Sequence, residues 1–147
     1  MRLGFAICTL VGLATTVAAK DPKFGFPVDC ELGQTCYIQQ YFDHDPSRQH
    51  TDYQCSTLSY DGHKGTDIAL PTLADMQSGV DVVAAAPGKV VATRNYVDDK
   101  YWRQGDDTNG RDCGNRVGIN HGGGWLTDYC HLKKGSVAVK VGDRVKM

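Results

Sequence analysis

The sequence has no block or stripe of basic side chains, because its 16 Lys and Arg residues are mixed with 17 Asp and Glu residues for a net charge of -1. This pattern does not favour nucleic acid or an anionic membrane surface as a partner. No C-x-x-C spacing occurs among the six cysteines, which argues against a structural zinc site built from thiolates. No long amphipathic helix pattern is present either. A chain of 147 residues therefore points to one β-rich domain with a core of its own.

One long apolar run lies at the N-terminus. Arg2 precedes it, residues 5–17 form it, and the small residues 17–19 end it. These features predict a signal peptide over residues 1–19, cleaved before Lys20, with Cys8 removed alongside it. The run is short for a membrane span, so an uncleaved anchor is the alternative. We expect a periplasmic or secreted protein without a stable membrane span after cleavage, of unknown oligomeric state.

Five cysteines remain after that cleavage. Exported proteins meet oxidising conditions, so disulfides are expected. Cys113 and Cys130 flank a predicted strand pair and should form a disulfide. In the chain-entropy model, closing this loop stabilises the folded state by roughly 3 kcal/mol. Two of Cys30, Cys36 and Cys55 should also pair, but the sequence does not say which two.

Residues 20–59 form a cysteine-containing N-terminal extension, irregular in composition and rich in Pro and Asp. Residues 37–42 could be one strand. His44 and His50 lie in its polar, turn-rich part, where exposed loop histidine is the simpler interpretation and metal binding the alternative.

Alternating or β-rich runs dominate the remainder, residues 60–147. Pro87-Gly88 separates two runs, at residues 80–86 and 89–93, and a glycine triplet joins a hairpin over residues 115–121 and 125–132. Gly142-Asp143 separates two further runs, at residues 137–141 and 144–146, which are predicted as strands joined by a turn. A short helix is expected over residues 72–78, and residues 95–111 form a loop whose Tyr101 and Trp102 either pack locally or wall a substrate groove. The fold class is mostly β, an antiparallel sheet with long loops.

His63 and Asp67 form an H-x-x-x-D motif with Gly65 between them. Zinc accepts imidazole nitrogen and carboxylate oxygen at roughly 2.0–2.2 Å. A fully extended chain would hold the two Cα atoms about 13 Å apart, too far for both side chains to reach one ion. The backbone must therefore bend between them, and Gly65 suits that bend. Alone, the motif is weak evidence for a metal site.

Together the segments resemble the LytM or lysostaphin-type zinc peptidases of family M23. Five segments carry the resemblance in family order: residues 62–67, 83–91, 114–122, 127–132 and 141–145. The resemblance implies a barrel-sandwich-like sheet, Zn²⁺ as cofactor, and a peptidase domain over residues 60–147. It makes His63 and Asp67 metal ligands and His131 a catalytic histidine that acts on the attacking water or the transition-state oxyanion. His121 matches a position that is ordinarily outside the metal shell.

One family feature is missing, because no histidine follows His131. The family completes its site with a later His-x-His pair, which supplies the third ligand. We expect an incomplete chain that lacks the C-terminal strands and, as it stands, the third ligand and activity. The alternatives are a degenerate domain, or replacement of the ligand by His44, His50 or His121.

The resemblance and the export signal together predict a zinc metallo-endopeptidase that hydrolyses peptide bonds in peptidoglycan, with peptidoglycan peptides as its partners. The alternative is a non-catalytic LytM-like module that binds cell-wall peptide or regulates an amidase. The Val-x-x-Gly-Asp-x-Val pattern near the end also occurs in lipoyl and biotinyl carrier domains, but the lysine hairpin that such domains need is absent.

Overall fold

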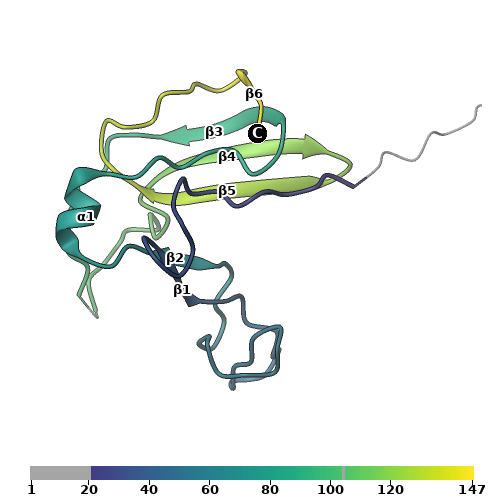
Figure 1. Ribbon diagram of the computed structural model, residues 1–147, viewed down its shortest axis with the longest axis vertical. Coiled ribbons are helices and arrows are strands. Elements are labelled where there is room, and N and C mark those ends of the chain that lie inside the picture. Colours follow the sequence, from purple (N-terminus) through teal and green to yellow (C-terminus); the bar gives the residue numbers. More distant parts are fainter. Residues whose placement is uncertain (1–20, 104) are drawn as a thin grey trace, which may run out of the picture.

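The computed structural model describes residues 21–103 and 105–147. These residues form two antiparallel sheets and one short helix (Figure 1). In chain order the elements are β1 (Tyr37–Gln40), β2 (Asp67–Ala69), α1 (Leu73–Ser78), β3 (Gly88–Arg94), β4 (Asn115–Gly122), β5 (Trp125–Leu132) and β6 (Arg144–Val145).

The larger sheet has four strands in the order β5-β4-β3-β6, with every pair antiparallel. Its buried centre consists of Val90 on β3 with Val117 and Ile119 on β4. Val117 and Ile119 are two residues apart, so their side chains lie on the same face of the strand. The mostly β, antiparallel fold predicted from the sequence is confirmed.

The predicted hairpin is present as β4 and β5, and its turn lies at the glycine triplet. Gly122, Gly123 and Gly124 all have positive φ, between 60° and 86°. Side chains with a Cβ rarely adopt this conformation, which explains three successive glycines. The disulfide between Cys113 and Cys130 closes the opposite end of the hairpin, as predicted.

The smaller sheet joins the N-terminal extension to the His63 motif. Strand β1 pairs with β2, with Ile38 opposite Ile68 and Gln40 opposite Asp67. The predicted strand over residues 37–42 is therefore present in shortened form. This pairing places β1 of the extension beside β2, below the larger sheet in Figure 1.

Two predicted strands are wrong. Residues 80–86 are irregular and do not pair with β3; instead the amides and carbonyls of residues 81–85 bond to the extension, as in Gly25 N to Ala85 O and Val83 N to Pro27 O. Residues 137–141 are also irregular, and β6 pairs with β3 rather than with them. In both cases the apolar run does not form the expected strand pair with its neighbour in sequence. The hydrophobic pattern indicates that a run is apolar, but not which segment its backbone bonds to.

The structure shows which two of the three cysteines in the extension form a disulfide. Cys30 bonds to Cys36, and Cys55 is a free, exposed thiol. The predicted signal peptide and its Cys8 lie outside the described residues. Across the described part of the chain, no helix is long and apolar enough to cross a membrane.

Candidate metal centre

The structure brings together the two predicted metal ligands. His63 precedes β2 on a loop, and Asp67 is the first residue of β2. His63 Nε2 lies 3.3 Å from Asp67 Oδ1. The expected bend is present at Gly65, but the positive φ in this loop, 75°, belongs to Gly62.

The imidazole of His63 is buried, with only 7% of the residue exposed. Two contacts hold it in addition to the one with Asp67. Its Nδ1 lies 2.7 Å from the carbonyl oxygen of Tyr41. The ring of Tyr60 stacks on it, with centroids 4.4 Å apart and an angle of 22° between the planes. The pKa of Tyr60 is raised, mainly because the phenol is partly buried and to a smaller extent because of the negative charge of Asp67.

The hydrogen bond to Tyr41 determines which ring nitrogen is available for a metal. A carbonyl oxygen only accepts, so the proton of a neutral His63 lies on Nδ1. The lone pair of Nε2 then faces Asp67 Oδ1, which is also an acceptor. A proton or a metal ion between these two acceptors would make the contact attractive.

The separation of these two atoms fits a tetrahedral zinc ion. Zn–N distances of 2.0–2.1 Å and Zn–O distances of 2.0–2.2 Å at the tetrahedral angle place the two ligand atoms roughly 3.3–3.5 Å apart. His63 Nε2 and Asp67 Oδ1 are 3.3 Å apart. The Tyr41 carbonyl is also the kind of acceptor that metal-ligating histidines commonly bond through their other nitrogen. His63 and Asp67 therefore fit zinc as two of its ligands.

A third ligand does not join the pair within residues 21–103 and 105–147, where no three His, Cys, Asp or Glu side chains gather closely enough to hold a metal. His44 and His50 are exposed in the extension. His121 has both ring nitrogens near internal oxygens, Nδ1 at 2.9 Å from Pro87 O and Nε2 at 2.8 Å from Thr127 Oγ1. Both ring nitrogens of His121 are therefore engaged by oxygens within the larger sheet and the Pro87 turn.

The predicted catalytic histidine, His131, lies near the end of β5 and is exposed. Its backbone has a φ of 58°, and its amide donates to the carbonyl of Cys113 at 3.0 Å. A disulfide joins Cys113 to the preceding residue, Cys130. The Thr108 hydroxyl, and to a smaller extent the charge of His131, lower the pKa of Asp112. His131 is thus anchored through its backbone while its side chain is accessible.

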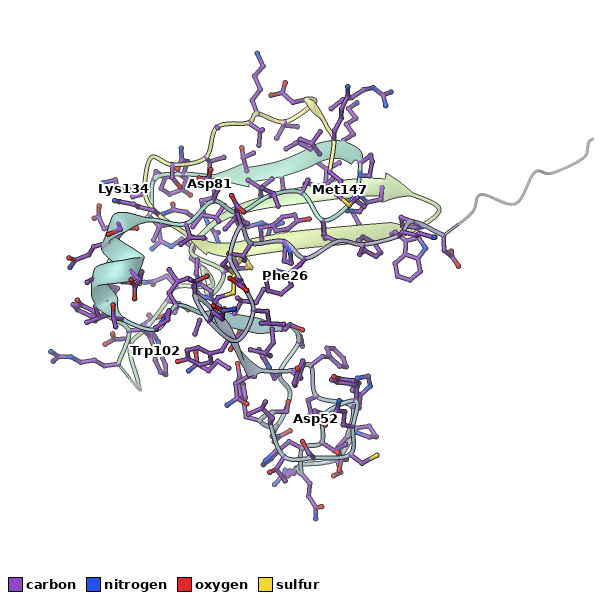
Figure 2. The ribbon with its side chains drawn as sticks, viewed as in Figure 1. Phe26, Asp52, Asp81, Trp102, Lys134 and Met147 are labelled. Atoms are coloured by element: carbon purple, nitrogen blue, oxygen red, sulfur yellow. A yellow bond between two sulfur atoms is a disulfide. The ribbon has the colours of Figure 1, made fainter. Side chains whose placement is uncertain are left out.

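An open groove of about 350 Å³ lies beside β2, but neither His63 nor Asp67 lines it. Thr66 and Ile68, on either side of Asp67, line it together with Thr127 and Tyr129 of β5. The extension supplies the opposite wall through residues 24–27. Tyr101 and Trp102, the other candidate groove residues, are 66% and 63% exposed and do not line this groove. Trp102 lies on the loop between β3 and β4, as labelled in Figure 2.

Sequence reasoning missed the residues that hold His63. Tyr41 acts through its carbonyl, which no side-chain pattern reveals. Asp43 accepts backbone N–H bonds from Asp45, Gly62 and Thr51, and these lower its pKa. The polar Asp-His-Asp-Pro sequence that begins at Asp43 indicates a structured turn. It does not indicate that this turn contacts the H-x-x-x-D motif of His63 and Asp67.

No curated protein and no solved structure matches the chain. The model for peptidase family M23 matches residues 61–147, more than half of the chain and the part that contains His63, Asp67 and His131. The chain belongs to peptidase family M23.

Proposed function

We propose that this protein is a zinc metallo-endopeptidase that hydrolyses peptide bonds in peptidoglycan, and that it works in the periplasm or outside the cell. Membership of a peptidase family supports the general reaction. The observation that carries the metal assignment is the pair of facing acceptor atoms, His63 Nε2 and Asp67 Oδ1, 3.3 Å apart.

Each residue of the proposed site has a distinct task. His63 binds through Nε2, because the Tyr41 carbonyl holds the ring proton on Nδ1. Asp67 adds a negatively charged oxygen ligand from the start of β2. Zinc, when bound, polarises the scissile carbonyl and makes water a better nucleophile near neutral pH. His131 moves a proton or stabilises developing charge on oxygen.

Two further features support a cell-wall substrate. The N-terminal sequence has the pattern of a signal peptide, and the two disulfides fit an oxidising compartment.

Clearing of a peptidoglycan suspension tests this function. The protein expressed from its complete reading frame should clear the suspension, and chelation of zinc should stop the clearing. His63→Ala and Asp67→Ala should each abolish activity, whereas His44→Ala, which changes an exposed histidine of the extension, should retain it. Clearing by the His63→Ala and Asp67→Ala variants at the wild-type rate would contradict the metal assignment.

A non-catalytic module is the second candidate function. The supporting observation is that, across the described residues, His63 and Asp67 gather no third ligand. Residues 1–147 alone should therefore bind zinc weakly. The encoding DNA after the codon for Met147 distinguishes the two functions: a His-x-His pair there favours the peptidase, and an open frame without it favours a module that binds wall peptide or a partner amidase.

A further inference from the structure

The N-terminal extension contacts the metal motif directly, on both sides of the His63 loop. The Tyr41 carbonyl accepts the Nδ1 proton of His63 at 2.7 Å. Two residues later, the amide of Asp43 donates to the carbonyl of His63 at 2.9 Å. The ring and the backbone of one proposed ligand are therefore both bonded to the segment 41–43, which lies outside the part of the chain that matches the family.

The side chain of Asp43 adds a third bond. Its Oδ2 accepts from the amide of Gly62, next to His63, at 2.9 Å. Its Oδ1 accepts from the amides of Asp45 and Thr51, each at 3.0 Å. The residue is only 7% exposed. Both oxygens are therefore used as acceptors from backbone donors, so one carboxylate joins the loop of the extension to the loop of the metal motif.

The chemistry of these bonds requires an aspartate rather than an asparagine. An asparagine keeps one acceptor oxygen and replaces the other with an N–H₂ group, which only donates. Whichever way the amide turned at position 43, its N–H₂ would face either the Gly62 amide or the amides of Asp45 and Thr51. A buried donor that faces another donor leaves both groups without an acceptor, which disfavours this arrangement.

Apart from these bonds, the loop is held by the His63 amide, which donates to the Tyr60 carbonyl at 3.0 Å, and by the Tyr60 ring, which stacks on His63. Gly62 has a φ of 75°, and around Gly62 and Gly65 a built Cβ would meet no atom within 4 Å. Lys64 is exposed. Metal sites need their ligands held to within about 0.5 Å, and support from residues behind the ligands commonly provides this.

We propose that the segment 41–43 is a positioning element for the zinc site and that Asp43 is its positioning residue. The proposal rests on the proposed function. The Tyr41 carbonyl selects the Nδ1–H tautomer of His63, and the Asp43 carboxylate fixes the Gly62–His63 backbone so that Nε2 points toward Asp67 before metal binds. The extension is thereby a working part of the metal centre.

Asp52 offers a matched control. It is equally buried, at 3% exposed, and it also accepts from backbone amides, those of Gln54 and Ser56, and from the Ser56 hydroxyl. It makes no bond to the His63 loop, and Figure 2 shows it at the far end of the extension, away from the larger sheet. Asp52→Asn therefore disturbs the turn at residues 52–56 of the extension without removing a bond to the His63 loop.

Two measurements on the protein from its complete reading frame test the proposal. Competition with a chromophoric chelator gives the zinc affinity, and ¹⁵N NMR of the histidine rings in the metal-free protein gives the His63 tautomer. Asp43→Asn should weaken zinc binding about 10-fold or more and reduce the Nδ1–H population. Asp52→Asn should leave both within about two-fold of wild type, although it lowers thermal stability.

The possible results separate the proposals. Equal losses in Asp43→Asn and Asp52→Asn, or no loss in Asp43→Asn, would overturn the positioning role. A wild type that binds no zinc would refute the proposed function, and the tautomer measurement would still decide the role of Asp43. If Asp43→Asn does not fold, Ser59→Ala replaces it: this hydroxyl donates to the same Tyr41 carbonyl at 2.8 Å, and its loss should weaken zinc binding about three-fold.

Discussion

Removal of the Cys113–Cys130 disulfide should destabilise the protein more than removal of the Cys30–Cys36 disulfide. The first bond spans 17 positions of sequence and the second spans 6. In the chain-entropy model the longer loop contributes about 3 kcal/mol and the shorter about 2 kcal/mol. The longer loop also contains most of the β4–β5 hairpin, which supplies two of the three fully packed core residues.

The loss should reach His131 as well. Its amide donates to the Cys113 carbonyl, so the disulfide and this bond together hold the open end of the hairpin. Without the cross-link, the backbone amide of His131 should exchange with solvent faster, while the β1–β2 pair should be unaffected.

Urea unfolding of two double variants measures the difference. Cys113→Ser/Cys130→Ser should lower the free energy of unfolding by about 3 kcal/mol, against about 2 kcal/mol for Cys30→Ser/Cys36→Ser. Hydrogen exchange at His131 should accelerate only in the first variant. Equal destabilisation by the two variants, or unchanged exchange at His131, would refute the reasoning.

Two further predictions concern the larger sheet and the extension. A Cβ at Gly88 would lie 2.5 Å from Ile119 Cγ2, so Gly88→Ala should lower the free energy of unfolding by about 1–3 kcal/mol. Gly65 has open space around it, so Gly65→Ala should be nearly neutral. Equal effects of the two substitutions in urea unfolding would contradict the packing around Gly88. The Ser56 hydroxyl and nearby amides lower the pKa of Asp52, so the stability contributed by this carboxylate is present above its unfolded pKa of about 4 and is lost as pH falls through the folded value. Asp52→Asn should therefore flatten the acid loss of stability in thermal melts below about pH 4; an unchanged slope would count against this role.

Local patterns predicted the central hairpin well. The glycine triplet, the alternation of Val117 and Ile119, and the placement of Cys113 and Cys130 all act within a few residues of one another, so the sequence carries their signal directly. The apolar runs at residues 80–86 and 137–141 were assigned to strands for the same reason, and wrongly. Their backbone partners lie elsewhere in the chain, in residues 25–29 for the first run, and hydrophobic periodicity does not encode that choice.

The proximity of His63 and Asp67 was predictable because the two residues are close in sequence and chemically distinctive. Their support was not. The Tyr41 carbonyl and the Asp43 carboxylate lie about twenty positions earlier and reach His63 only after β1 has paired with β2. No composition or spacing rule connects an extension of this kind to a ligand that follows it.

Zinc content after equilibrium dialysis tests the central claim most directly. The protein from its complete reading frame should retain one zinc ion per chain, His44→Ala should retain it equally, and His63→Ala should lose it. Retention of zinc by His63→Ala at the wild-type level would contradict the assignment of His63 and Asp67 as the metal pair.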